Sequence, residues 1–510
     1  MRYIQARWES EDGVLEPTVF ELGRRGEGGV VIARPEEELV EEIGDLEDII
    51  PRELVREEIG LPGLTEPEVA RHFNHLAQMN FGVDSGPYWL GSCTMKYTPK
   101  SVMRLASHQG IRNLHPYAPD ELSQGVLKIL YELQEMLSSI TGLPHFTLQP
   151  AAGAHGELVG ALMIRKRLLD MGERRDEMLI PDSAHGSNFA SAAMAGFKVI
   201  RIPPSEGGTV DMGALKAAIT ERTAGMMITN PNTLGIFESD IREISDLLHA
   251  NGSYLYYDGA NLNAIMGWIL LSDMGVDVAH LNMHKTFSAP HGGGGPGAGA
   301  VGVVDEFKEY LPVPIIVKKG EKYGLSYDVP KSVGKIRMFY GNVGVLVKAW
   351  AYLKLLGSDG VRTSAGIAVL NANYARKKLM DVGLEVPYGR NRPCKHEFVL
   401  SLSNFRKKFG VRALDFAKAL IDRGYHPPTM YFPPIVPEAF MMEPTESDSL
   451  RELDGYVEAM REIKELAEER PEDILDAPKN SAITRIDDAF ANKKLWLTWK
   501  IYEESKEGKG

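Results

Sequence analysis

Short apolar runs alternate with amphipathic stretches between about residues 120 and 300. The apolar runs predict strands, and the stretches with apolar residues three and four positions apart predict helices. The predicted strands are 178–181, 198–203, 225–229 and 254–257. The predicted helices are 125–139, 156–169, 210–219 and 241–250. This alternation is typical of an α/β fold with a mostly parallel sheet and helices on both faces.

The pattern differs toward both ends of the chain. The charge-rich start contains PEEELVEEIGDLEDIIPRELVREE, and Thr65 and Glu68 then predict a capping-box helix start. Such an arm either contacts a neighbouring subunit or is a solvated charged surface. Near the other end, a strand (397–402), two helices (413–423 and 447–467) and the connection YFPPIVP indicate a smaller α+β domain. We therefore expect an N-terminal arm (1–85), a large domain (86–375) and a small C-terminal domain (376–510).

Composition and charge narrow the class of protein. A chain of 510 residues is too long for one hydrophobic core. With 57 basic and 70 acidic residues the net charge is −13, which argues against a nucleic-acid-binding surface. Cys93 and Cys394 offer no disulfide framework, which favours a reducing compartment. No targeting peptide or apolar run of about 18 residues is present, so we expect no membrane span and a cytoplasmic location.

Three loops follow predicted strands at the edge where ligands bind in parallel sheets. In LQPAAGAHGEL (148–158), small residues open a helix whose free N–H groups could approach a phosphate. LIPDSAHGSNFASA (179–192) holds His185, and ITNPNTLGIFE (228–238) holds Thr233. Each signal is weak alone, since small residues also permit close packing, a lone histidine is usually structural, and the third segment reads as an ordinary turn.

Asp258 and Lys285 each follow an apolar strand pattern. The carboxylate of Asp258 is therefore expected to be half-buried, which is costly without a cation or donor. A buried ammonium at Lys285 is also costly, and forming an imine avoids that cost. Pyridoxal phosphate needs such a pair, a lysine for the covalent link and an anion that keeps the pyridine nitrogen protonated. A salt-bridged aspartate with an exposed lysine is the alternative, and the spacing favours the cofactor.

The glycines after Lys285 match GxGxxG at 297–302, but no strand precedes them and no helix follows. A dinucleotide site is therefore not expected. His280 and His284 lie in a strand-like alternation rather than on one helical face, so we predict no metal site. The glycines instead predict a turn that brings backbone close to the cofactor, followed by an antiparallel strand at the sheet edge.

Seven segments carry a resemblance that covers the chain from about residue 80 onward. They are GPYWLGSCTMKYTPK, LHPYAPDE, LQPAAGAHGEL, PDSAHGSNFASAAMAG, YYDGANLNA, LNMHKTFSAPHGGGGPGAGAVGV and EPTESDS. In content and order they resemble the glycine cleavage system P-protein family. The resemblance implies a fold-type I pyridoxal-phosphate-dependent fold, decarboxylation of glycine and transfer of the aminomethyl group to the lipoyl arm of the H-protein.

The resemblance also implies roles for individual residues. Lys285 corresponds to the lysine that binds pyridoxal 5'-phosphate covalently, Asp258 to the partner of the ring nitrogen and His185 to the residue stacked on the ring. By their positions in motifs, Ala152 and Gly153 match the phosphate-binding loop and Thr233 the loop near the ring substituents.

Long family members contain two related halves, and this chain resembles only the half that bears the lysine. This implies a heterotetramer in which subunit 1 completes the active site. Another fold-type I enzyme, such as an aminotransferase or a hydroxymethyltransferase, would share Lys285 and Asp258 but need no lipoyl carrier. A non-catalytic structural subunit is the other alternative, and the presence of both residues argues against it.

Overall fold

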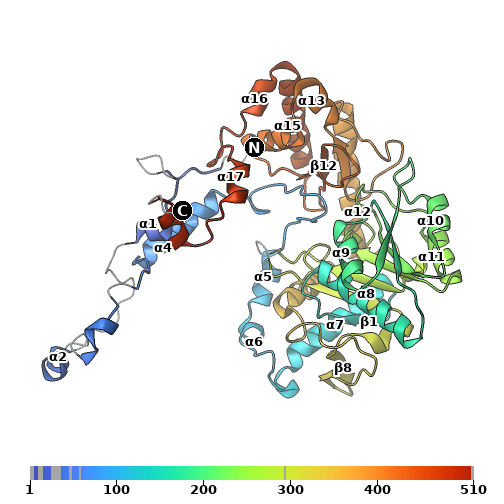
Figure 1. Ribbon diagram of the computed structural model, residues 1–510, viewed down its shortest axis with the longest axis horizontal. Helices are drawn as coiled ribbons and strands as arrows, with labels where there is room; N and C mark the ends of the chain where they lie inside the picture. Colours follow the sequence, from blue (N-terminus) through green and yellow to red (C-terminus); the bar gives the residue numbers. More distant parts are fainter. Residues whose placement is uncertain are drawn as a thin grey trace. The chain divides into compact units, whose positions relative to one another are not determined.

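The computed structural model describes residues 5–9, 15–23, 36–44, 49–56, 59–291 and 295–506 (Figure 1). These residues form two compact units. Unit 1 comprises residues 83–420 and 425–475, and unit 2 comprises the described residues up to 82 together with 421–424 and 476–506. Parts of the charged arm and Gly292, Gly293 and Gly294 of the expected turn lie outside the described residues.

Unit 1 contains a seven-stranded sheet in the order β1-β7-β6-β5-β4-β2-β3. The strands are β1 (His145–Thr147), β2 (Glu177–Pro181), β3 (Lys198–Ile202), β4 (Thr223–Thr229), β5 (Tyr254–Gly259), β6 (Val278–Asn282) and β7 (Gly299–Val303). Pairs β2·β3, β2·β4, β4·β5 and β5·β6 are parallel, whereas β7 is antiparallel to both β6 and β1. The mostly parallel sheet and the four predicted strands are thus confirmed.

One prediction about this sheet is wrong. The strand after Lys285, β7, is antiparallel as expected, but it lies inside the sheet instead of at its edge. The reason is that β1 pairs with its free side, with His145 opposite Val303. A strand of three residues is too short for its pattern to be recognised in the sequence.

Helices cover both faces of the sheet. They are α5 (Lys100–Ala106), α6 (Gln109–Arg112), α7 (Gln124–Thr141), α8 (Gly153–Asp170), α9 (Gly186–Met194), α10 (Met212–Ala218) and α11 (Ile241–Ala250), with the short turns η2 (Asp120–Leu122), η3 (Leu262–Ala264), η4 (Ser272–Met274) and η5 (Asp305–Tyr310). Because side chains alternate along a strand, Leu255 and Tyr257 of β5 join one apolar core, whereas Tyr254 and Tyr256 join the other. The predicted helices and the two-faced architecture are confirmed.

Helix α8 lies unusually close to the sheet. A Cβ atom at Gly160 would lie 2.3 Å from the ring of Tyr256, and one at Gly156 would lie 2.9 Å from Cβ of His280. At Gly153 it would lie 2.4 Å from the amide of Asn282. A stripe of glycines on the inner face therefore lets α8 press on β5 and β6, with its N-terminus at the end of β6.

The remainder of unit 1 begins with β8 (Ile315–Lys319) and β9 (Lys322–Ser326), a separate hairpin. Helix α12 (Val343–Asp381) is kinked at Gly357, whose φ is 62°, and it runs through residue 375. The elements that follow are β10 (Phe398–Ser401), α13 (Ser403–Phe409), α14 (Ala413–Asp422), β11 (Thr429–Met430), β12 (Ala439–Met442), α15 (Leu450–Glu469) and α16 (Pro471–Leu475). Strands β10, β12 and β11 form an antiparallel sheet, so the predicted strand and both predicted helices here are confirmed.

Unit 2 joins the two ends of the chain. Its elements are α1 (Val19–Leu22), α2 (Glu37–Ile43), η1 (Arg52–Leu54), α4 (Glu66–Gln78), α17 (Asp488–Lys493) and α18 (Trp499–Lys506). The capping box is confirmed, since the backbone N–H of Thr65 donates to Glu68 at 2.7 Å. Phe20 of α1 stacks on Trp499 of α18 at 5.1 Å, although the sequence-based division placed residues 476–506 in the small domain. The boundaries near 85 and 375 remain proposals.

Replacement of Gly160 by alanine tests the close contact of α8. We expect Gly160→Ala to lower the free energy of unfolding by about 1–3 kcal/mol, because its methyl group would overlap Tyr256. The gain in helix propensity, up to about 1 kcal/mol, offsets only part of this loss. Urea unfolding measures the effect. Gly125→Ala in α7, where nothing lies within 4 Å, is the matched control and should not destabilise the protein; equal effects would contradict the proposed contact.

Candidate active site

The loops predicted to carry chemistry meet at one edge of the sheet. Strands β2, β4, β5 and β6 run parallel, so the segments after them converge at their carboxyl ends. The backbone N–H of His185 donates to Thr229 at 3.3 Å, and Thr229 in turn donates to Asp258 at 2.9 Å. Thr233 donates its hydroxyl to the backbone oxygen of Ser183 at 2.8 Å. The loops after β2 and β4 are thus fastened together around Asp258.

Asp258 is a fully buried carboxylate with a donor on each oxygen. Asn188 donates to Oδ2 at 2.8 Å, beside the Thr229 hydroxyl, and the backbone N–H of Ala260 donates to Oδ1 at 2.9 Å. Burial by itself raises the pKa of Asp258, but the electrostatic interactions with the His280 and His185 rings and these donors together hold the pKa below its usual value. Asp258 is therefore an anion at neutral pH.

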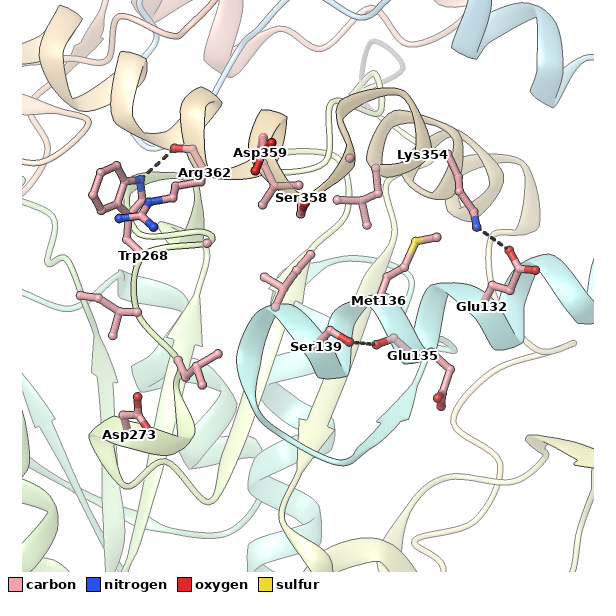
Figure 2. A pocket seen from close by; sticks show the side chains of 17 residues that line it. Glu132, Glu135, Met136, Ser139, Trp268, Asp273, Lys354, Ser358, Asp359 and Arg362 are labelled. Carbon is pink, nitrogen blue, oxygen red and sulfur yellow. Dashed lines mark hydrogen bonds and ion pairs between the residues drawn. The ribbon is translucent and has the colours of Figure 1, made fainter.

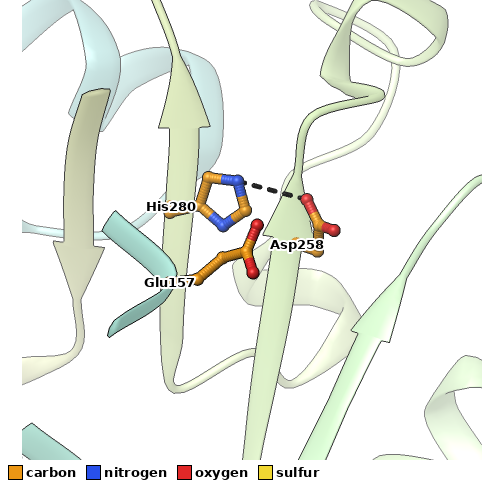
Figure 3. A group of neighbouring side chains, drawn as sticks. All are labelled: Glu157, Asp258 and His280. Atoms are coloured by element: carbon orange, nitrogen blue, oxygen red, sulfur yellow. Dashed lines mark ion pairs between the residues drawn. The ribbon is translucent and has the colours of Figure 1, made fainter. Parts of the chain in front are cut away.

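Two further titratable side chains, His280 and Glu157, lie next to Asp258 (Figure 3). Nε2 of His280 lies 3.2 Å from Oδ1 of Asp258 without forming a hydrogen bond, and Nδ1 lies 2.8 Å from the hydroxyl of Tyr256. Burial lowers the pKa of His280. Glu157 of α8 points toward both residues, and burial together with the charge of Asp258 raises its pKa to about 8. The cluster therefore holds one negative charge, on Asp258.

The same three side chains could be taken for metal ligands, because their ligand atoms lie within 4.8 Å of one another. However, both oxygens of Asp258 already accept N–H or O–H groups, and Glu157 accepts hydroxyls from Ser187 and Ser191. Donors directed at carboxyl oxygens stabilise an anion or a shared proton and leave fewer lone pairs for a cation. We keep the prediction that no metal binds here.

His185 caps helix α9 and connects to Glu157. Its Nδ1 accepts the backbone N–H of Ser187 at 3.2 Å and lies 2.6 Å from the hydroxyl of Ser187, which donates to Glu157 at 2.8 Å. Burial is the main cause that lowers the pKa of His185, so the ring is neutral. Its ring centre lies 5.4 Å from that of Phe432, at an interplanar angle of 56°. The imidazole orientation is thus fixed at one nitrogen.

Lys285 lies in the turn directly after β6 and is partly buried, less than the sequence indicated. No hydrogen bond or ion pair within the described part of the chain involves its amino group. Its charge nevertheless lowers the pKa values of Glu157, Cys93 and His185, so the amine lies within electrostatic reach of these groups. An amine without a partner beside a buried anion is suited to covalent chemistry.

The residues fit pyridoxal phosphate in three respects. Asp258 supplies the buried anion for the ring nitrogen, and Lys285 the amine. Helix α8 begins at Gly153 with Ala152 as its N-cap and has no side-chain cap, which leaves backbone N–H groups for a phosphate. The hydroxyls of Ser183 and Thr286 are buried and have no hydrogen-bond partner in the described part of the chain, and such polar groups are suited to a ligand.

A surface pocket of about 840 Å³ lies elsewhere in unit 1, beside the α12 kink (Figure 2). On its walls Arg362 stacks over Trp268 at 4.1 Å, and Lys354 pairs with Glu132 at 3.1 Å. None of the active-site residues that the sequence predicted is among those that line this pocket. The pocket therefore does not define the candidate active site.

Sequence reasoning missed several residues around Asp258. Thr229, Asn188 and Glu157 were not singled out, and His280 was considered only as a metal ligand. Glu157 could have been recognised from the sequence, because it lies among the glycines of α8 and the helix face that carries them had to be buried. The other contacts depend on strand order, which the sequence does not specify.

Comparisons with known proteins agree with this geometry. The family model "Glycine cleavage system P-protein" matches residues 38–325, and "Glycine dehydrogenase, C-terminal domain" matches residues 364–484. The probable glycine dehydrogenase (decarboxylating) subunit 2 of Pyrococcus abyssi is 53% identical over 510 residues, which is 99% of each chain. The protein of the same description from Kosmotoga olearia is 50% identical over 94% of this chain and 99% of its own.

Solved structures share the fold. A glycine decarboxylase (P-protein) of the glycine cleavage system, in inhibitor-bound form, has a TM-score of 0.69 at 23% identity and covers 85% of this chain and 100% of its own. A cysteine desulfurase from Thermococcus onnurineus has a TM-score of 0.59 at 15% identity, covering 74% of this chain and 95% of its own. The predicted fold class is confirmed.

The proton on Glu157 predicts a pH effect on stability. The folded protein holds this proton up to a pKa of about 8, whereas the unfolded chain releases it near 4.5, so the free energy of unfolding contributed here falls as pH rises between these values. We expect Glu157→Gln to reduce that fall in cofactor-free protein, measured by urea unfolding across the pH range. Glu135→Gln, at an exposed position, should leave the slope unchanged, and equal slopes in all three proteins would refute the assignment.

Proposed function

The chain belongs to the glycine cleavage system P-protein family, and we propose that it is the subunit of that enzyme which holds the cofactor. It is a glycine dehydrogenase (decarboxylating) that removes the carboxyl group of glycine and passes the aminomethyl group to the lipoyl arm of the H-protein. One observation carries the proposal most strongly. It is the placement of a buried, ionised Asp258 and of Lys285 at the carboxyl ends of two neighbouring parallel strands, where the amine of Lys285 forms no hydrogen bond or ion pair with the described residues.

Pyridoxal 5'-phosphate, when bound, supplies the ring that accepts the electrons released with carbon dioxide. Asp258 keeps a proton on the ring nitrogen, because its carboxylate is buried and stays ionised. Lys285 provides the amine that holds the cofactor and that glycine replaces. Ala152 and Gly153 bind the phosphate through the N–H groups at the start of α8.

His185 would hold and orient the cofactor ring by stacking on it, and Thr233 would shape the loop beside the ring substituents. The hydrogen bonds of Nδ1 to Ser187 support this role for His185, because they fix the plane of the imidazole. Burial of Asp258 excludes water from its carboxylate, which would strengthen its interaction with a protonated ring nitrogen.

We propose that subunit 1 covers part of this chain in a heterotetramer and that the lipoylated H-protein reaches Lys285. The description "subunit 2" of the relatives supports a partner subunit. Unit 2 exposes many apolar side chains, as surfaces covered by another polypeptide do. The most exposed include Leu497 and Leu61, each 76% accessible, Ile59 and Leu54. A pocket of about 550 Å³ in the same unit is lined by Phe20, Phe73, Trp496 and Trp499.

The location and further partners follow from composition. No helix among the described residues is long and apolar enough to cross a membrane. Cys93 and Cys394 are free thiols. We propose a cytoplasmic protein that binds glycine and protein partners and does not bind nucleic acid, in keeping with its net charge of −13.

The exchange of carbon dioxide with the carboxyl group of glycine tests the function. We expect exchange when the chain is combined with subunit 1 and the lipoylated carrier, and none with Lys285→Ala, which lacks the amine. Borohydride reduction followed by peptide mapping should place the trapped cofactor on Lys285 alone. Lys354→Ala, an exposed lysine, is the control and should retain full exchange. Turnover of glycine without any carrier requirement would instead indicate an aminotransferase or a hydroxymethyltransferase.

Asp258→Asn tests the role of the buried charge. The amide has nearly the same shape but carries no charge, so the cofactor should still bind while exchange falls on the order of a hundredfold or more. The cofactor absorbance and the exchange rate give the two measurements. Exchange near the wild-type rate would show that the ring nitrogen requires no anion.

A further inference from the structure

Two sequence motifs that resemble family segments have no role in the proposed function, and the structure brings them together. The segment 88–98 of GPYWLGSCTMKYTPK, called here the strap, lies against 443–448 of EPTESDS. Leu90 pairs with Met442 in an antiparallel bridge, and the backbone N–H of Glu443 donates to Trp89 at 3.3 Å. The indole N–H of Trp89 donates to Asp448 at 3.1 Å. The strap thus extends the end of β12.

Two buried carboxyl groups bind the middle of the strap, at residues 92–94. Glu443 accepts the backbone N–H groups of Cys93 at 3.1 Å and Thr94 at 2.9 Å, and the Thr94 hydroxyl at 2.5 Å. Glu397 accepts the backbone N–H of Ser92 at 2.9 Å and the amide of Asn261 at 3.1 Å. Ser92 and Thr94 have φ values of 65° and 49°, which non-glycine residues rarely adopt. The carboxyl groups therefore stabilise a turn that the backbone alone disfavours.

The other end of the strap contacts the loop that follows Lys285. The hydroxyl of Ser288 donates to the backbone oxygen of Tyr97 at 3.0 Å, and the hydroxyl of Thr98 donates to the backbone oxygen of Ser288 at 2.9 Å. Ser288 has a φ of 53°, and its N–H donates to the backbone oxygen of Lys285 at 3.2 Å. A chain of contacts thus leads from the carboxyl pair through the strap to the backbone of Lys285.

A buried ion pair holds the strap at Lys96, between these two sets of contacts. The ammonium of Lys96 donates to Glu446 at 2.6 Å and to Asn263 at 2.8 Å, and Lys96 is only 5% accessible. Glu446 also accepts the hydroxyls of Ser364 and Tyr352. The strap is therefore fixed at three points along its length.

The two carboxyl groups lie close enough for the charge of one to affect the ionisation of the other. Glu397, Glu443 and His396 are almost inaccessible to solvent, and their ligand atoms lie within 4.8 Å of one another. Burial raises the pKa of Glu443 to about 7, and burial with the charge of Glu443 raises the pKa of Glu397 well above its usual value. Burial lowers the pKa of His396 to about 3, so the imidazole is neutral.

Charged and titratable groups on the neighbouring elements complete the surroundings of the pair. The charge of Lys285 favours ionisation of both carboxyl groups. Cys93 lies beside them, and burial raises its pKa to about 11. The charge of Glu446 raises the pKa of His396, whereas that of Lys96 lowers it. Because backbone N–H groups point at both carboxyls, the pair is arranged for an anion and a proton rather than for a metal ion.

We propose that Glu397 and Glu443 are positioning residues for Lys285. Together they hold one proton and anchor the strap through hydrogen bonds. The strap in turn holds the loop that sets the position of the lysine. Glu443, with three donors, is the carboxylate, and Glu397 carries the proton. The consequence for Lys285 rests on the proposed function, whereas the fastening of the strap does not. Loss of the shared proton at high pH places two negative charges together and loosens the turn.

Hydrogen exchange of the cofactor-free full-length chain tests the fastening. In Glu443→Gln the amide NH₂ group would face the N–H and O–H groups that now donate to the carboxylate, and some of these hydrogen bonds would be lost. We therefore expect protection factors in peptides covering 91–98 and 286–291 to fall roughly tenfold or more. Thr94→Val, which removes only the hydroxyl donor, should give a smaller fall in the same peptides. Glu438→Gln is the matched control: Glu438 lies at the opposite end of β12, where it accepts the N–H of Ala413 and pairs with Arg406. It should leave both peptides unchanged.

The pH dependence tests the shared proton. Glu397 has its pKa raised well above the usual value, so protection of 91–98 in the wild type should fall only at alkaline pH, where its proton is lost. In Glu397→Gln, which stays neutral, protection should remain constant over the same pH range. In the holoenzyme, Glu443→Gln should also shift the pH midpoint of the cofactor absorbance, whereas Glu438→Gln should not. Unchanged protection in both Glu443→Gln and Thr94→Val, or the same pH dependence in Glu397→Gln as in the wild type, overturns the proposal. Loosening of the strap without any spectral shift retains the fastening and removes its effect on Lys285.

Discussion

The arrangement of the active-site edge depends on keeping one fully buried carboxylate ionised. Asp258 has no access to water, and burial of an isolated charge is prohibitively costly. The chain meets this requirement with Asn188, Thr229 and the N–H of Ala260, which belong to three different segments. Burial and the charge of Asp258 together keep a proton on Glu157. His280 lacks one because burial outweighs the charge of Asp258, which by itself would favour its protonation.

The fold was predictable wherever a pattern extended over enough residues. The alternation of strands and helices between 178 and 250 gave correct elements, and Thr65 with Glu68 predicted a helix start that is present. Strand β1 was not predicted, because three residues are too few to show an alternating pattern of apolar and polar positions. Without β1, the prediction put β7 at the edge of the sheet instead of inside it. The association of residues 476–506 with the N-terminal arm is a contact between distant segments, which local patterns do not encode.

The candidate site was predictable in part for the same physical reason. Asp258 lies near the end of a strand, and His185 and Lys285 lie in segments that follow strands, so their position at the sheet edge followed once the sheet was inferred to be parallel. The roles given to them came from the family resemblance, and the structure adds their surroundings. Glu397 and Glu443 were not singled out as site residues in the sequence. Their burial depends on packing between segments up to several hundred positions apart, as in the contact of Thr94 with Glu443.

The composition of unit 2 has a consequence for synthesis of the protein. Phe20 and Trp499 stack on each other, yet Phe20 is synthesised long before Trp499. The seven-stranded sheet of unit 1 is complete once residue 303 has emerged, whereas Phe20 meets its ring partner only when α18 has been made. In the interval the apolar side chains around Phe20 are open to non-specific association, so chaperone binding to this segment would protect the nascent chain.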